Sequence, residues 1–151
     1  MRPVFRNARP GDYPELILLL QQAGLSTDDF SGSRFEWFSV VAGASLLAAG
    51  AIEPFGSCGL LRSVVVREEA RGARLGSALV TRLEQRAAQD GINSLVLLTE
   101  RASAFFEALG YERVSRESMP ERVRSSRQFS SDGAGNAVCL CKHLPVLMQS
   151  A

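Results

Sequence analysis

The stretch with the clearest chemical pattern runs from Ser63 to Ser77 and contains three valines, a charged turn and a glycine-bearing entry into a helix. Three consecutive β-branched residues favour an extended strand. Apolar residues then recur at every fourth position from Leu75 to Ala87, which is typical of the buried face of a helix. The start of a helix offers unpaired N–H groups and the positive end of the helix dipole, and glycine lets an anion approach that backbone closely. The stretch therefore predicts a site for a phosphate group.

The spacing excludes two common phosphate-binding motifs. The stretch has no Gly-Lys-Ser/Thr tripeptide of a Walker loop, and it lacks the three glycines and the acidic residue of a dinucleotide fingerprint. The pattern Val-x-x-x-x-Arg-Gly-x-x-x-Gly instead resembles the coenzyme A pyrophosphate loop of the Gcn5-related N-acetyltransferase (GNAT) superfamily. The resemblance implies acetyl-CoA as co-substrate, with backbone contacts from Val64, Val65 and Val66 to the pantetheine and thioester. It also implies a pyrophosphate loop that consists of Arg71, Gly72, Ala73, Arg74, Leu75, Gly76 and Ser77.

One position of this loop departs from the family pattern. Arg74 stands where the family has a glycine. A right-handed helical backbone at Arg74 would not demand glycine, and the guanidinium would add hydrogen-bond donors beside the phosphates. The alternative is an ordinary strand–turn–helix connection whose arginines face solvent.

A second stretch, Leu97 to Tyr111, resembles the family element in which an aromatic pair precedes Leu-Gly-Phe/Tyr. In many members the second aromatic residue is a tyrosine that protonates the leaving thiolate, but here it is Phe106, which cannot donate a proton. The resemblance then implies that Ser103 and Phe106 only line the cofactor channel. The general acid is another residue, a water or unnecessary, and the nearby phenol of Tyr111 is expected to be structural.

Acetyl transfer to an amine needs a base and a donor for the oxyanion. A bulge beside Val65 and Val66 would free a backbone N–H, so Val66 is predicted to stabilise the oxyanion. Glu53, at the end of an apolar strand, is predicted to be the base, acting through water, and Glu100 is the second candidate. The alternative for Glu53 is a solvated carboxylate at a strand end.

The acceptor is predicted from the arginines between positions 122 and 127. A bidentate arginine would bind the carboxylate of an amino-acid-like amine and orient its nitrogen. Arg127 is the first candidate and Arg124 the second, with Thr99 as a further contact. The alternative is that these arginines face solvent on a loop.

Two finer resemblances concern the subfamily. The short connection after Thr99 is similar to that in the acetyltransferase domain of N-acetylglutamate synthases. The segments Met119 to Phe129 and Ala137 to Lys142 look like a subgroup of acetyltransferases linked with arsenic resistance. Relatives in that subgroup often carry a cysteine near Asp132 to Ala134, which this chain lacks, and this argues against a three-thiol arsenic site.

The elements that must position these residues follow from periodicity and from glycine and proline breaks. Asp12 is expected to cap the first helix, and Ser26 to Arg34 is expected to be a short helix or loop that borders the acceptor. Strands are predicted at 4–8, 35–41, 45–53, 59–66, 94–99, from Tyr111 onwards and at 136–143, and helices after Asp12, from Leu75 to Gly91 and at 102–109. Together with the resemblance, this order implies an α/β (α+β) fold with a mixed, mostly antiparallel central sheet and helices on both faces.

Length, net charge and cysteine usage limit the class of protein and its partners. The chain has 151 residues and a formal net charge of +1, so one domain over 1–151 with a loose tail is expected, without nucleic acid or membrane as partner. No signal segment or apolar span is apparent, which favours a cytoplasmic protein. Cys139, Cys141 and His143 share a strand face but show no fourth ligand, so no metal is predicted.

These expectations describe an enzyme that acetylates a small-molecule amine and leave a homodimer open. Two alternatives remain: a coenzyme A-binding sensor without catalysis, and an acetyltransferase for protein N-termini or lysines.

Overall fold

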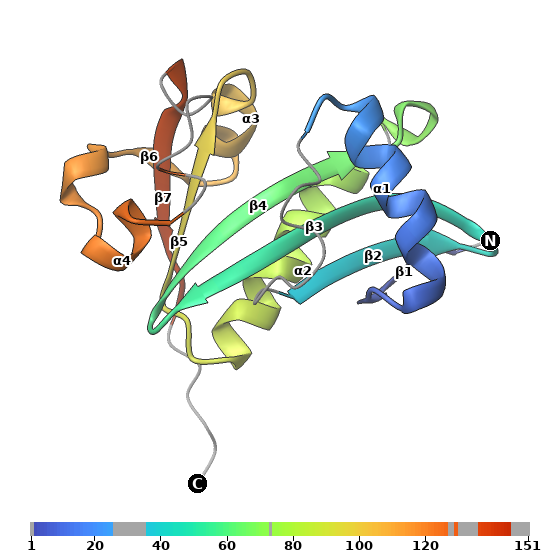
Figure 1. The fold of residues 1–151 in the computed structure, drawn as a ribbon, viewed down its shortest axis with the longest axis horizontal. Helices are drawn as coiled ribbons and strands as arrows, with labels where there is room; N and C mark the ends of the chain where they lie inside the picture. The colour runs from blue at the N-terminus through green and yellow to red at the C-terminus, as the bar shows by residue number, and fades with distance from the viewer. Residues whose placement is uncertain (1, 26–35, 73, 127–128, 130–135, 146–151) are drawn as a thin grey trace, which may run out of the picture. The chain divides into compact units, whose positions relative to one another are not determined.

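The computed structural model of the chain describes residues 2–25, 36–72, 74–126, 129 and 136–145 (Figure 1). The segment Ser26 to Arg34, expected to border the acceptor, lies outside them. The chain groups into two compact units. Unit 1 comprises Met1–Glu53 and Leu61–Arg86, and unit 2 comprises Pro54–Leu60 and Ala87–Ala151.

The strands form a seven-stranded sheet in the order β1-β2-β3-β4-β5-β7-β6. The strands are β1 (Val4–Asn7), β2 (Glu36–Ala42), β3 (Ser45–Phe55), β4 (Cys58–Val66), β5 (Ser94–Thr99), β6 (Glu112–Arg113) and β7 (Val138–His143). The pairs β1–β2, β2–β3, β5–β7 and β6–β7 are antiparallel, whereas β4 and β5 are parallel. The expectation of a mixed, mostly antiparallel sheet is therefore confirmed.

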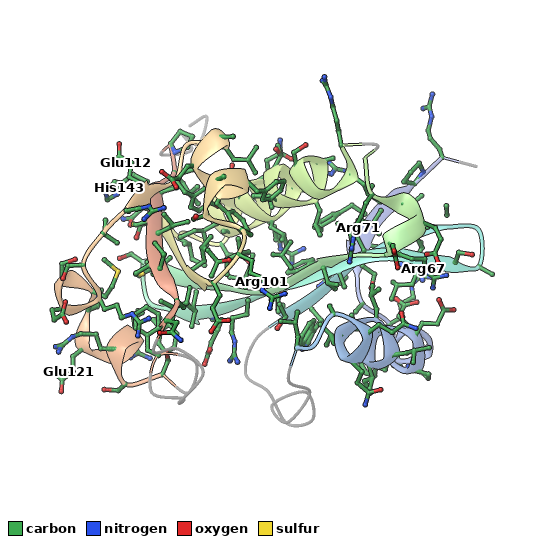
Figure 2. All side chains as sticks on the ribbon, turned by 90° about the horizontal axis from the view of Figure 1, so that it is seen from above. Arg67, Arg71, Arg101, Glu112, Glu121 and His143 are labelled. Atoms are coloured by element: carbon green, nitrogen blue, oxygen red, sulfur yellow. The ribbon has the colours of Figure 1, made fainter. Side chains whose placement is uncertain are left out.

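The helices are α1 (Tyr13–Gln22), α2 (Leu75–Gln89), α3 (Ser103–Ala108) and α4 (Glu121–Arg124), with short 3-10 turns at Pro10–Asp12, Glu68–Ala70 and Arg116–Ser118. In unit 1, α1 and the first part of α2 cover opposite faces of the strands (Figure 2). This arrangement explains why β2, β3 and β4 are apolar almost throughout, because a strand covered on both faces has no solvent side.

The core of unit 1 has a layer on each face of the strands. On one face, Leu16, Leu19 and Leu20 of α1 pack against a cluster of strand residues, namely Val41, Leu46, Ala49 and Val65. On the other face, α2 lies close to the backbone of β3. A Cβ atom at Gly50 would lie 3.0 Å from Leu83 Cδ1 and 3.4 Å from Val64 Cγ2, so glycine sets the helix–sheet distance there.

The core of unit 2 is built on β5 and β7. Buried Cys58, Leu60, Val96, Val123 and Cys139 form one cluster, in which Val123 comes from α4. The short helix α4 was not predicted, because a single turn shows no helical period.

One expectation about the elements needs correction. Asp12 precedes α1 but its side chain does not cap that helix. It accepts a hydrogen bond from Arg9 N at 2.9 Å and pairs with Arg6 at 2.8 Å, so it closes the preceding turn instead. β4 and β5 pair in parallel through Cys58–Leu60 and Ser94–Val96.

Candidate active site

The last part of β4 combines an irregular backbone with a well-packed side chain. Ser63 has φ +55°, a left-handed conformation that interrupts a regular strand. Val65, two residues later, is buried against α1, while Val64 and Val66 are half-buried. This irregularity precedes the three valines, and the bulge beside Val65 and Val66 stays a prediction.

The direction of the next backbone N–H groups follows from one hydrogen bond. Arg67 N donates to Leu47 O of β3 at 2.7 Å. Successive N–H groups of a strand point to alternate sides, so the N–H of Val66 points away from β3. The parallel register with β5 ends at Leu60, before this part of β4.

A short loop then connects β4 to α2, and two of its arginines are anchored. Arg71 Nε donates to Val66 O at 3.1 Å, which fastens the loop to the last residue of β4. Arg67 pairs with Glu15 of α1 at 3.1 Å, and the same carboxylate oxygen accepts from Leu46 N. Figure 2 shows Arg67 and Arg71 at this end of unit 1. Sequence reasoning did not identify Glu15, because its partners are far away along the chain.

The conformation of Arg74 differs from the expectation. Its φ is +59°, in the left-handed region, and Gly72 also has a positive φ of +89°. The idea that Arg74 is right-handed helix and needs no glycine is therefore wrong. A glycine at this position relieves backbone strain, and a side chain there costs roughly 1 kcal/mol. The helix begins one residue later, where Ser77 Oγ donates to Arg74 O at 3.0 Å.

Glu53, the predicted base, has an arginine partner. Glu53 Oε1 accepts from Arg62 Nη1 at 3.1 Å, and the exposed fractions are 19% for the Glu53 side chain and 12% for Arg62. The carboxylate is therefore mostly sheltered rather than solvated. Arg62 was missed, although the turn at Gly56 and Ser57 folds β4 back along β3 and brings the two residues together. Glu100, the second candidate, is exposed.

The predicted residues of unit 2 mostly have structural partners. Thr99 Oγ1 accepts from Ala102 N at 2.9 Å, and Ser103 Oγ accepts from Arg113 Nη2 at 3.4 Å. Phe106 is only 6% exposed and packs edge-on against Phe105 and Tyr111, with centroid separations of 5.0 and 5.4 Å. Tyr111 is 2% exposed, in keeping with a structural role.

Of the two arginines predicted to bind the acceptor carboxylate, Arg124 lies among the described residues. Arg124 Nε donates to Met119 O at 3.0 Å, so one N–H group of its guanidinium already has a partner in the same segment. Arg127 lies outside the described residues, as does Ala73 of the loop. The neighbouring Arg122 lies over the ring of Phe55, 5.8 Å from its centroid.

The cysteines of unit 2 have the properties of core residues. Burial, together with the neighbouring thiols of Cys141 and Cys58, raises the pKa of Cys139 to about 11. Burial also raises the pKa of Cys58 and of Cys141. Among the residues that the structure describes, no group of three or more His, Cys, Asp or Glu side chains could hold a metal ion. No described helix is both long enough and apolar enough to cross a membrane.

The segment from β4 to α2 combines an irregular strand end, a glycine-bearing loop and the start of a helix. Residues 6–111 match the model of the acetyltransferase (GNAT) family. The chain belongs to this family. The match includes the whole segment from β4 to the first turns of α2 and ends at Tyr111.

Similar GNAT proteins include enzymes for amino acids. An amino-acid acetyltransferase of Ectopseudomonas mendocina is 32% identical over 116 residues, which cover 73% of this chain and 27% of that protein. The chain thus spans about a quarter of the length of this relative.

Two solved structures show the same fold. N-acetylglutamate synthase of Neisseria gonorrhoeae, complexed with coenzyme A and N-acetyl-glutamate, has a TM-score of 0.83 at 22% identity, covering 96% of this chain and 36% of that one. The ribosomal-protein-S18-alanine N-acetyltransferase of Escherichia coli has a TM-score of 0.71 at 17% identity, covering 99% and 97%.

Proposed function

We propose that the chain is an acetyl-CoA-dependent N-acetyltransferase that acetylates the amine of a small, amino-acid-like acceptor. The observation that carries the proposal is the segment from Ser63 to Ser77. It joins an irregular strand end, an N–H directed away from β3 and a glycine-bearing helix entry within a chain of the GNAT family.

The proposed cofactor site lies at the start of α2. The helix has 15 residues. The N–H groups of its first turn have no partner within the helix, so they and the positive end of the dipole are available to the pyrophosphate. We assign the pyrophosphate to Gly72, Gly76 and Ser77 with their loop neighbours, and the pantetheine to the backbone of Val64 to Val66. The coenzyme A in the Neisseria gonorrhoeae synthase structure supports this assignment.

The proposed reaction is a direct attack on the thioester. The amine nitrogen forms a bond to the acetyl carbon, and the Val66 N–H donates to the oxyanion that develops. The C–S bond then breaks, and the thiolate of coenzyme A leaves. The proton lost by the amine passes through water to Glu53, whose carboxylate is oriented by Arg62. The thiolate takes its proton from solvent, because Phe106 has none to give.

The proposed acceptor carries a carboxylate beside its amine. Arg127 is assigned to that carboxylate, with Arg124 second because its Nε is engaged, and Thr99 as a further contact. The names of the amino-acid acetyltransferase and of N-acetylglutamate synthase support an amino acid as acceptor. A place in the arsenic-resistance subgroup, a cytoplasmic location, a single domain and a homodimer stay predictions of the sequence.

Two measurements test the proposal. Calorimetric titration of acetyl-CoA into the protein is expected to show binding, and a lack of binding would contradict the proposal. Thiol release is then followed with acetyl-CoA and a panel of amino acids, glutamate analogues and an N-terminal peptide. We expect release with an amino acid. Release with the peptide alone would show a protein acetyltransferase, as the likeness to the Escherichia coli enzyme allows, and binding without release would show a sensor.

A further inference from the structure

Strand β3 contains a bulge that contacts the end of β4. The register between β2 and β3 shifts between Val40 and Val41, which makes Leu47 the extra residue of β3 at this point. Such a bulge interrupts the ladder and bends the strand, and bulges are frequent beside active sites. Leu47 O accepts a hydrogen bond from Arg67 N at 2.7 Å. The extra residue is therefore bonded to the chain directly after the last residue of β4.

Glu15 of α1 holds the same region from the side of the helix. Its oxygen Oε2 accepts from Leu46 N and from Arg67 Nη2, both at 3.1 Å. Leu46 directly precedes the bulge, and Arg67 directly follows β4. A carboxylate forms stronger hydrogen bonds with such donors than a neutral acceptor does. One side chain thus links α1, β3 and the end of β4.

The peptide group between Val66 and Arg67 has partners at both of its polar ends. Its N–H donates to Leu47 O at 2.7 Å, and its oxygen, Val66 O, accepts from Arg71 Nε at 3.1 Å. The side chain of Arg67 is in turn paired with Glu15. These contacts restrain the backbone of Val66, and with it the direction of the Val66 N–H group.

The position of the Glu15 ion pair matters more than its contribution to stability. The side chains of Glu15 and Arg67 are 45% and 36% exposed, and ion pairs exposed to this degree contribute little to stability. The pair between Glu36 and Arg86, also in unit 1, has similar exposed fractions of 51% and 34%. That pair joins β2 to α2, whereas Glu15 acts on the end of β4.

We propose that Glu15 is a positioning residue for acetyl transfer. It acts through Arg67 and through the bulge at Leu47 to hold the Val66 N–H in the direction of the developing oxyanion. A donor that is already fixed stabilises the transition state better than one that must reorient during the reaction. The inference rests on the proposed function, which assigns the oxyanion to the Val66 N–H.

Glu15→Ala removes both hydrogen bonds of the carboxylate and tests this role. We expect kcat to fall about tenfold or more while the Kd for acetyl-CoA stays within about twofold of the wild-type value, because a displaced donor affects the transition state and not cofactor binding. Glu15→Gln keeps an oxygen acceptor and is expected to lose less of kcat. Thiol release measures kcat, and calorimetry measures Kd.

Glu36→Ala is the matched control, since it breaks an ion pair of similar exposure in the same unit. Its kcat should equal that of the wild type. Wild-type kcat in Glu15→Ala, or equal falls in Glu15→Ala and Glu36→Ala, would overturn the inference. A fall in kcat with an equal loss of acetyl-CoA affinity would also overturn it, because that result indicates a general disturbance of unit 1.

Hydrogen exchange at the Arg67 amide gives a measurement that needs no catalysis. NMR is expected to show about tenfold faster exchange of this N–H in Glu15→Ala, because its bond to Leu47 O opens more easily, and no change in Glu36→Ala. An unchanged rate in Glu15→Ala would contradict the inference. A wild-type protein that releases no thiol with any acceptor would contradict the proposed function, and the exchange rate would then decide alone whether Glu15 holds the strand end.

Discussion

The ion pair between Glu53 and Arg62 gives the proposed base a fixed orientation. One guanidinium N–H holds one carboxylate oxygen at 3.1 Å, and both side chains are largely sheltered from solvent. The second carboxylate oxygen, Oε2, is not part of this bond. A carboxylate held in this way can accept a proton through water without losing its place in the hairpin.

Replacement of Glu53 by glutamine tests this role. The amide keeps the shape of the side chain and can still accept from Arg62, but it is no base. We expect kcat to fall by about 10² to 10⁴ while the Kd for acetyl-CoA is unchanged. Steady-state kinetics and calorimetry measure the two effects. Glu100→Gln is the matched control, and a larger loss of kcat there would transfer the role of base to Glu100.

The strain at Arg74 gives a prediction for stability. Arg74→Gly removes a side chain from a left-handed backbone and is expected to raise the free energy of unfolding by about 1 kcal/mol. Arg82→Gly makes the same exchange inside α2 and is expected to lower it by about 1 kcal/mol. Urea denaturation measures both values. Two equal losses would mean that Arg74 is not strained in solution.

The contact between α2 and β3 determines how closely the phosphate-binding helix lies on the sheet. Gly50 faces Leu83 of α2, with Val64 of β4 close by, so this glycine permits the close approach. The same helix begins at the phosphate loop. Its packing therefore fixes the position of the N-terminal turn that the proposal assigns to pyrophosphate.

Gly50→Ala is predicted to destabilise the protein by about 1–3 kcal/mol. The new Cβ would lie 3.0 Å from Leu83 Cδ1, so a side chain or the helix must move. Gly11→Ala is the control, because a Cβ there meets nothing within 4 Å. Thermal or urea unfolding compares the two variants, and similar stabilities for them would show that α2 is loosely packed on β3.

Much of the element order could be predicted, because the strands are long apolar runs and glycines mark the ends of elements, such as Gly56 after β3 and Gly110 after α3, both with positive φ. The short helix α4 could not be predicted from the hydrophobic period, because it has only 4 residues. The pairing of Glu53 with Arg62 depends on the register of a hairpin, which composition alone does not fix. The positive φ at Arg74 could not be predicted either, because arginine usually avoids the left-handed region.

At the scale of the whole chain, charge is nearly balanced but locally uneven. The formal net charge is only +1, yet Arg67, Arg71 and Arg74 fall within eight positions beside the proposed phosphate site. Attraction for a multiply charged cofactor therefore depends on the local arrangement of arginines rather than on total charge.

Salt dependence is expected to reveal this local effect. Raising NaCl from about 0.05 to about 0.5 M shortens the screening length and should weaken acetyl-CoA binding about three- to tenfold. Acetyl-pantetheine, which has no phosphates, is the control and should show no comparable loss. Calorimetry at several salt concentrations measures both. A Kd for acetyl-CoA that does not change with salt would place the phosphates away from the arginines.

The hydrogen bond from Arg71 to Val66 O has a consequence for how this segment can diverge among related sequences. The carbonyl of Val66, the last of β4, accepts from the side chain of Arg71 beyond the turn. This hydrogen bond does not depend on which residues lie between Val66 and Arg71. Glu68 and Glu69 in that turn are exposed. Substitutions should therefore accumulate at these two glutamates, whereas an exchange of Arg71 would require another donor for the end of the strand.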